Sequence, residues 1–170
     1  MYKLQKVGIE SLNILTHLMK TTFIQAYEDI HTKENIEAYC SENFTNKIAT
    51  NILSTHMYTC IIAFKQNVPL GFFILKDKEC PYKLNHTSLE LQQLYILKAE
   101  YNTGLGKRLF LHAMKIAQNS SKKYLWLCVS NTNNRALCFY KKMGFEKTGV
   151  GKDLRIGTHK LSSSIMTYQL

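Results

Sequence analysis

The feature that most constrains this fold is a strand followed at once by a glycine-rich turn and a basic helix. The run 94–109 is Leu-Tyr-Ile-Leu-Lys-Ala-Glu-Tyr-Asn-Thr-Gly-Leu-Gly-Lys-Arg-Leu. Its first residues are apolar, as in a strand, and its glycines let the backbone come close to a ligand. The free N–H groups in a helix's first turn point outward at the positive end of its dipole. The run therefore predicts a phosphate site.

The spacing within this run excludes two common nucleotide-binding loops. A Walker loop has a glycine five residues before its Gly-Lys pair and Ser or Thr after it, but this chain has Tyr101 and Arg108 at those places. A Rossmann fingerprint has a third glycine three residues after Gly106, where Leu109 stands, and an acidic residue about twenty residues later, which is absent here. The run is therefore neither a Walker loop nor a Rossmann loop, and the phosphate it is predicted to bind belongs to another kind of ligand.

A second motif, the run 133–145, is Asn-Asn-Arg-Ala-Leu-Cys-Phe-Tyr-Lys-Lys-Met-Gly-Phe. The two motifs together resemble the GNAT N-acetyltransferase superfamily, which has Gln/Arg-x-x-Gly-x-Gly/Ala after a strand and later Asn-x-x-Ala-x-x-Phe-Tyr-x-x-x-Gly-Phe. The resemblance covers almost the whole chain. Within the superfamily, the runs 90–97 and 155–159 look like those of bacterial spermidine/spermine acetyltransferases of the PaiA type.

Apolar spacing predicts the order of elements along the chain. Helices are expected over 10–26, within 32–53, and over 104–119 and 133–143; strands are expected over 4–7, 57–64, 70–75, 88–97, 124–129, 146–150 and 164–170. The segment 65–69 separates two strands as a hairpin connection. We expect an α/β fold with a mixed, mostly antiparallel central sheet and helices on both faces, similar to the GNAT acyl-CoA acyltransferase fold.

Composition is consistent with one N-acetyltransferase domain over 1–170. The 45% hydrophobic content can form a substantial core, and no linker or repeat divides the chain. The five cysteines form no Cys-x-x-Cys pair, and the N-terminus lacks the pattern of a secretory signal. There is no apolar run of membrane-spanning length. We therefore expect a cytoplasmic protein that does not associate with a membrane, as a monomer or homodimer.

The net charge of +10 lies in one part of the sequence. Residues 101–170 contain 12 Lys and Arg but only 2 Asp and Glu, whereas the preceding hundred residues balance. A basic surface suits nucleic acid, but it also suits a cosubstrate that carries a pyrophosphate and a 3′-phosphate. Because several of the cations fall inside the two motifs, acetyl-CoA is favoured and nucleic acid is the weaker alternative.

The resemblance implies where acetyl-CoA would lie, namely between the strand ending near Leu97 and the strand 124–129. The backbone of Leu94, Tyr95 and Ile96 would bind the pantetheine and polarise the thioester carbonyl. The other residues expected to contact acetyl-CoA are Asn102, Thr103, Gly104, Leu105, Gly106, Lys107, Asn133, Tyr140 and Lys142. The sequence departs from the family at Tyr101, where Gln or Arg is usual.

The resemblance also suggests two catalytic residues. Tyr140, in the Phe-Tyr pair, would be the acid that protonates the leaving thiolate, although its place on an apolar helix face also suits a core aromatic residue. An alkylammonium titrates near ~10 and must lose a proton before it attacks. Glu90 would be the base that accepts this proton, with ordered water as the alternative. Since Glu90 alternates with apolar residues, it could also simply face solvent.

The expected reaction is direct attack of a primary amine on acetyl-CoA in a ternary complex. A polyamine such as spermidine or spermine would be favoured by carboxylates on the N-terminal helices: Glu28, Asp29, Glu34, Glu37 and Glu42. Protein or peptide amines are the alternative acceptors, and a non-catalytic CoA-binding or nucleic-acid-binding module is the alternative class. The histidines and cysteines show no metal-ligand spacing, so no metal is expected.

Overall fold

The computed structural model describes residues 1–82, 84 and 86–170. Two short 3₁₀ helices, Ile9–Ser11 and Lys98–Glu100, precede α1 and α4. The helices are α1 (Leu12–Tyr27), α2 (Lys33–Asn43), α3 (Asn46–Ser54), α4 (Leu105–Gln118) and α5 (Asn134–Lys142). The strands are β1 (Lys3–Lys6), β2 (Tyr58–Lys65), β3 (Val68–Lys76), β4 (Ser88–Ile96), β5 (Tyr124–Ser130), β6 (Glu146–Val150), β7 (Leu154–Ile156), β8 (His159–Leu161) and β9 (Ser163–Gln169).

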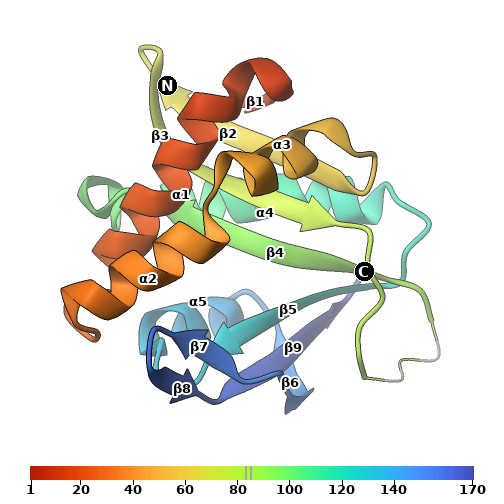
Figure 1. Cartoon of the computed structure of the whole chain (residues 1–170). Coiled ribbons are helices and arrows are strands. Elements are labelled where there is room, and N and C mark those ends of the chain that lie inside the picture. Colours follow the sequence, from red (N-terminus) through yellow and green to blue (C-terminus); the bar gives the residue numbers. More distant parts are fainter. Residues whose placement is uncertain (83, 85) are drawn as a thin grey trace.

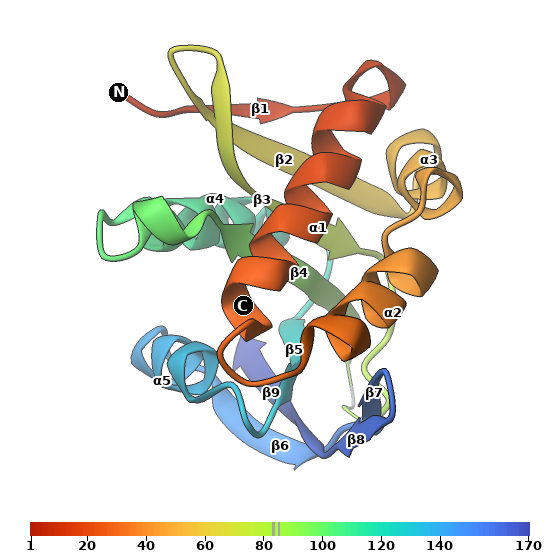
Figure 2. The same cartoon turned by 60° about the vertical axis from the view of Figure 1, so that its left-hand side comes forward.

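Seven strands form the central sheet, in the order β1-β2-β3-β4-β5-β9-β6. All neighbours are antiparallel except β4 and β5, which run parallel. Helices α1, α2 and α3 cover one face, and α4 and α5 cover the other (Figures 1 and 2). The expected mixed, mostly antiparallel sheet with helices on both faces is confirmed. In the part of the chain that is described, no helix is long and apolar enough to cross a membrane.

Each face of the sheet has its own apolar core. On β3, Phe73 and Leu75 pack toward α4, whereas Phe72 and Ile74 pack toward α1. All four side chains are at most 2% exposed. A strand covered on both faces reads as a continuous apolar run, because successive side chains alternate between two buried surfaces. The sequence therefore predicts β3 from its run of apolar residues, although apolar and polar residues do not alternate along it.

The connection between β2 and β3 is shorter than expected. Its turn consists of Gln66 and Asn67, which both have positive φ, of 51° and 65°. Pro69, expected in the loop, instead lies inside β3 opposite Phe64, where the register shifts. A bulge of this kind tolerates proline because the regular ladder is already interrupted.

The sequence did not predict the small hairpin of β7 and β8. Its strands have three residues each and turn at Gly157, whose φ is +58°. The hairpin packs on α2, where the Thr158 N–H donates to Asn35 Oδ1 at 3.1 Å. Ile156 of β7 is 2% exposed and completes the core below α1 and α2. Three residues are too few for a period to be recognised.

The two central strands separate partway along their length. β4 and β5 are paired only at Ser88↔Tyr124, Leu89↔Leu125 and Glu90↔Trp126. Beyond Glu90, the ladder between β3 and β4 shifts so that Gln92 becomes an extra residue between the pairs Leu75↔Leu91 and Ile74↔Gln93. A bulge bends its strand and changes the local twist. From there on, β4 presents one edge of N–H and C=O groups that β5 does not satisfy.

Candidate active site

Two cavities, each of about 880 Å³, meet where β4 and β5 separate. The first, the aromatic cavity, lies between α1, α2, α3 and the two strands; the second, the glycine-loop cavity, lies between the 98–107 segment, α1 and α5. Five residues line both cavities: Leu94, Tyr95, Asn133, Ala136 and Tyr140. The arrangement is suited to two ligands that approach from opposite ends and meet beside Tyr140.

The turn before α4 has the backbone conformation that an anion site needs. Asn102 and Gly104 have positive φ, of 65° and 89°, and Asn is the non-glycine residue that best tolerates this region. Arg108 N–H bonds back to Gly104 O, so the amides of Gly106 and Lys107 precede the first intrahelical bond. Among the described residues, a Cβ on Gly106 would meet only Ile96 Cδ1, at 3.7 Å. The backbone is therefore exposed to the cavity at this point.

Most residues predicted to contact acetyl-CoA come together in the glycine-loop cavity. Its lining includes Leu94, Tyr95, Ile96, Asn102, Gly104, Gly106, Lys107, Asn133, Tyr140 and Lys142. Thr103 and Leu105 are not part of the lining. The Leu105 side chain is fully buried in the core, and the Thr103 hydroxyl donates to Glu100 O at 2.8 Å. The backbone N–H groups of both residues are engaged as well, since that of Thr103 donates to Glu100 O and that of Leu105 donates to Thr103 Oγ1, each at 3.4 Å.

A network that sequence reasoning missed ties the glycine loop to the N-terminus. The Tyr2 hydroxyl donates to Glu100 Oε2 at 2.6 Å, and the Thr103 hydroxyl also reaches this carboxylate, at 3.1 Å. Glu100 lines the cavity, and its carboxylate is hydrogen-bonded to the Tyr2 hydroxyl. No sequence signal connects residues so far apart in the chain.

Asn133 joins α5 to α1 across the separated strands. Its Oδ1 accepts from the Ala136 N–H at 3.0 Å, which confirms the predicted N-cap. Its Nδ2 donates to the Tyr27 hydroxyl at 3.3 Å. The Asn133 side chain therefore caps α5 and also connects it to α1 through Tyr27.

The aromatic cavity is lined by five tyrosines and two phenylalanines: Tyr27, Tyr39, Tyr58, Tyr95, Tyr140, Phe23 and Phe44. Burial raises the pKa of Tyr39 to about 12, with smaller contributions from Tyr27 and Cys40. Burial, and then the neighbouring Tyr27, also raises the pKa of Tyr140. These phenols are therefore protonated at neutral pH, and burial makes each of them a weaker acid than an exposed tyrosine.

Tyr140 is a core aromatic residue, one of the two interpretations that the sequence allows, and it also lines the candidate site. It is 9% exposed and belongs to the α4/α5 core, with its ring centroid 5.3 Å from that of Phe139 and 5.6 Å from that of Phe145. It also lines both cavities at their meeting point. The packing holds the ring in place, so the hydroxyl has a defined position.

Glu90 lies in a different place from the other candidate residues. The alternation of β4 puts Leu89 and Leu91 in the α4/α5 core and Glu90 on the opposite face. Among the described residues that line the two cavities, Glu90 is absent. It is 7% exposed, so a solvent-facing position is wrong, and its Oε2 lies 3.7 Å from Lys78 Nζ. Burial raises its pKa, while Lys78 and Lys76 act in the opposite direction.

Replacing this carboxylate should stabilise the protein at neutral pH. Folding raises the pKa of Glu90, so the folded state favours the protonated carboxyl. The stability that this contributes is complete below the pKa of the unfolded state and is lost as pH rises through the pKa of the folded state. Gln cannot ionise, so the melting temperature of Glu90→Gln should exceed that of the wild type at pH 7 to 8, and the difference should vanish at acidic pH. The exposed Glu146 provides a control, Glu146→Gln. A difference that does not depend on pH would contradict the assignment.

The carboxylates of the N-terminal helices do not form one continuous face. Glu28 and Asp29 lie 2.8 and 3.6 Å from Lys98 Nζ, beside the glycine-loop cavity. Glu37 pairs with Lys33 on α2, at 3.7 Å. Glu42 is the one carboxylate in the described lining of the aromatic cavity. Within residues 1–82, 84 and 86–170, no group of three or more His, Cys, Asp or Glu side chains could hold a metal ion.

The chain is similar in sequence to known acetyltransferases. A model of the family described as "Acetyltransferase (GNAT) family" matches residues 19–145. The chain is similar to a spermidine N(1)-acetyltransferase of Thermoplasma acidophilum, with 29% identity over 149 residues, which are 85% of this chain and 88% of that protein.

Solved structures show the same fold. The crystal structure of the PaiA N-acetyltransferase from Thermoplasma acidophilum, in complex with coenzyme A, has a TM-score of 0.82 at 24% identity and covers 100% of this chain and 99% of that one. A probable acetyltransferase from Staphylococcus epidermidis has a TM-score of 0.76 at 19% identity, with 99% of each chain covered.

Proposed function

Because this chain belongs to the acetyltransferase (GNAT) family, we propose that it transfers the acetyl group of acetyl-CoA to a primary amine by direct attack in a ternary complex. The observation on which the proposal rests is the meeting of two cavities at Tyr140, where β4 and β5 separate. One cavity has the properties of a cosubstrate site, and the other has those of an amine site.

The glycine-loop cavity fits acetyl-CoA in three ways. The free amides of Gly106 and Lys107 at the start of α4 suit a pyrophosphate. The unpaired edge of β4 at Leu94, Tyr95 and Ile96 suits the amides of a pantetheine chain. Lys107 and Lys142 supply positive charge on the lining. When bound, acetyl-CoA supplies the acetyl group and a thiolate leaving group.

The roles of the chain's own residues follow from their positions. Tyr140 donates the proton that the leaving thiolate needs, since its side chain carries an O–H group and lines both cavities. Backbone N–H groups of β4 at Leu94–Ile96 polarise the thioester carbonyl. The amine loses its proton to ordered water rather than directly to Glu90, because Glu90 lies outside the described lining of both cavities.

The acceptor is a cationic amine, and a polyamine such as spermidine or spermine suits the aromatic cavity. Tyrosine faces attract ammonium groups through cation–π interactions, and Glu42 can pair with a second ammonium. Gln93 lines the same cavity, and its buried Oε1 has no hydrogen-bond partner among the described residues. An ammonium N–H would satisfy this acceptor. The similarity to a spermidine N(1)-acetyltransferase supports the same acceptor class.

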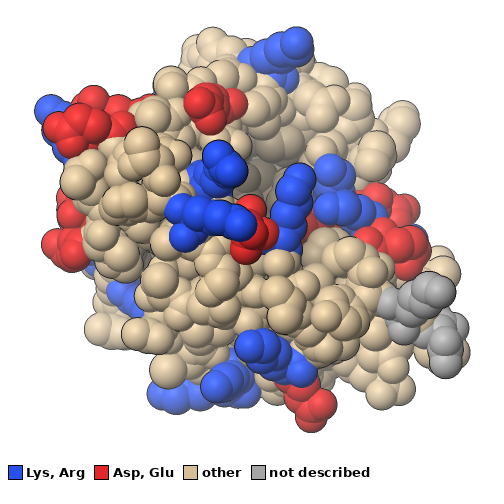
Figure 3. Space-filling model, turned by 60° about the horizontal axis from the view of Figure 1, so that its bottom comes forward, with Lys and Arg blue, Asp and Glu red and all other residues tan. Residues whose placement is uncertain are grey.

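Nucleic acid is less well supported as a partner. On the face shown in Figure 3, Lys and Arg side chains lie in separate groups with Asp and Glu between them. Nucleic-acid-binding surfaces usually concentrate Lys and Arg in a patch or stripe that follows the phosphates. The positive charges in the lining of the glycine-loop cavity have a sufficient explanation in the phosphates of acetyl-CoA.

An amine panel tests the proposed function. Thiol release from acetyl-CoA, with mass spectrometry of the products, should show faster turnover with spermidine and spermine than with butylamine, a monoamine of similar reactivity. Glu42→Gln should raise KM for spermidine but not for butylamine, because only the polyamine has a second ammonium. No thiol release with any amine, in a protein that binds CoA, would refute catalysis. Acetylation of peptide amines alone would refute the polyamine acceptor.

A further inference from the structure

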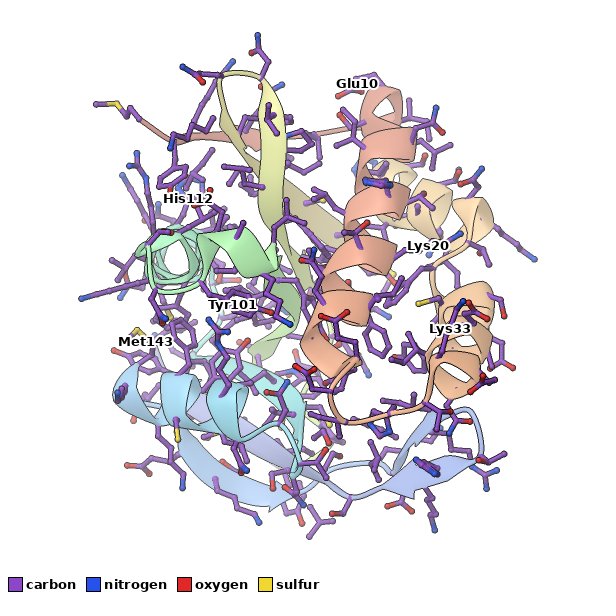
Figure 4. All side chains as sticks on the ribbon, turned by 90° about the vertical axis from the view of Figure 1, so that its left-hand side faces the viewer. Glu10, Lys20, Lys33, Tyr101, His112 and Met143 are labelled. Atoms are coloured by element: carbon purple, nitrogen blue, oxygen red, sulfur yellow. The ribbon has the colours of Figure 1, made fainter. Side chains whose placement is uncertain are left out.

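Tyr101 and Arg135 form a contact across the glycine-loop cavity. The Arg135 guanidinium carbon lies 3.2 Å from the centroid of the Tyr101 ring, and both residues line the cavity. Figure 4 shows Tyr101 in the space between α4 and α5. From this contact we infer that Arg135 binds the pyrophosphate of acetyl-CoA and that Tyr101 is the positioning residue that holds it there. The inference rests on the proposed use of acetyl-CoA.

The position of Arg135 in its helix calls for an anion. Arg135 is the second residue of α5, where the positive end of the helix dipole disfavours a cation. None of the ion pairs formed by the described residues includes Arg135. The two carboxylates of the cavity have other partners, since Asp29 pairs with Lys98 and Glu100 accepts from Tyr2. The five guanidinium donors are therefore available to a ligand.

The tyrosine ring explains why the guanidinium lies over the loop. Arginine stacks on aromatic faces, which restrains a long side chain that would otherwise sample many rotamers. Tyr101 begins the turn that leads to Gly106 and Lys107, whose amides are proposed to hold the pyrophosphate. Its ring therefore holds the planar, bidentate donor group of Arg135 beside that segment. The motif that this chain resembles has Gln or Arg at the position of Tyr101, and in this chain the guanidinium comes instead from α5.

Binding measurements test the role of Arg135 without depending on turnover. Isothermal titration should give a Kd for CoA, and for 3′-dephospho-CoA, that rises about tenfold in Arg135→Gln. Arg135→Lys should recover only part of this loss, because an ammonium cannot make the bidentate contact. Lys141→Gln removes the same charge from the same helix, outside the described lining of the cavity, and should change Kd little. The salt dependence of Kd should weaken in Arg135→Gln but not in Lys141→Gln.

Variants of Tyr101 test the positioning role. Tyr101→Phe keeps the ring and should bind CoA like the wild type, whereas Tyr101→Leu should weaken binding about threefold. In the Arg135→Gln background, Tyr101→Leu should have no further effect, because the ring then has no guanidinium to hold. The reduction in salt dependence should also appear in Tyr101→Leu, which a purely structural role of the ring would not produce.

The possible failures are distinguishable. If the wild type binds no CoA, the proposed function fails. If the wild type binds CoA and Arg135→Gln binds it equally well, only the inference on Arg135 fails. A loss that is seen with CoA but not with 3′-dephospho-CoA would overturn the pyrophosphate assignment in favour of the 3′-phosphate. Independent effects of Tyr101→Leu and Arg135→Gln would overturn the role of Tyr101.

Discussion

Tyr140→Phe should lower kcat by about a hundredfold or more while leaving the Kd for CoA nearly unchanged. A positioned general acid contributes roughly 10² to 10⁴ to a rate, and the proposed acid is lost when the hydroxyl is removed. The ring itself remains, so its contacts with Phe139 and Phe145, at centroid distances of 5.3 and 5.6 Å, should persist. Stopped-flow or steady-state thiol release measures kcat, and a melting curve checks the fold.

A matched control for this variant is Tyr168→Phe. Tyr168 packs against Phe145, with ring centroids 5.7 Å apart, but lies outside the lining of both cavities as far as the chain is described. Its variant should retain the kcat of the wild type. A Tyr140→Phe protein with the wild-type kcat would mean that Tyr140 is a core aromatic residue only and that another group protonates the thiolate.

Gly106→Glu should weaken CoA binding by about a hundredfold or more without reducing stability. Gly106 is the second residue of α4, where an acidic side chain is favourable to the helix dipole and any side chain is more favourable than glycine. A Cβ at this position would have room, since Ile96 Cδ1, at 3.7 Å, is the one neighbour within 4 Å in the described part of the chain. The new carboxylate would face the pyrophosphate, and like charges 4 Å apart repel by about 4 kcal/mol at an effective dielectric constant of 20. Affinity and melting temperature should therefore change in opposite directions.

Two further substitutions separate charge from size at this position. Gly106→Ala should bind CoA within a fewfold of the wild type, and Gly106→Gln should lose less affinity than Gly106→Glu, by the contribution of the charge alone. Titration calorimetry measures the affinities, and thermal unfolding measures the stabilities. Equal affinities for CoA in Gly106→Glu and Gly106→Ala would show that the pyrophosphate is not bound at the start of α4.

Local sequence patterns predicted the long elements well because each has enough residues to show a period. Strand 146–150 was expected and found, and helix 104–119 became α4, Leu105–Gln118. The N-cap at Asn133 was also readable, because capping depends on residues a few positions apart. The β7–β8 hairpin was not readable, since its strands are too short for a period and it is stabilised by contacts with α2.

The orientation of side chains within the site was less predictable than their place in the sequence. Glu90 alternates with leucines, which suggested either a base or a solvated residue, yet the structure buries it beside Lys78. Burial of a polar position depends on which elements cover that face of the sheet, and this information is not local. The bulge at Gln92 could not be predicted from local sequence either, because a register shift depends on how two strands pair.

By itself, the sequence determined the family, the order of the elements and the glycine-rich turn, since these depend on neighbouring residues and on motif spacing. Only the tertiary structure decided that β4 and β5 separate after three pairs, that two cavities meet at Tyr140, and that Arg135 lies over Tyr101. The physical reason is that cavities and stacking contacts arise between segments distant in the chain. Their geometry is set by how the whole sheet twists and packs, which no local pattern encodes.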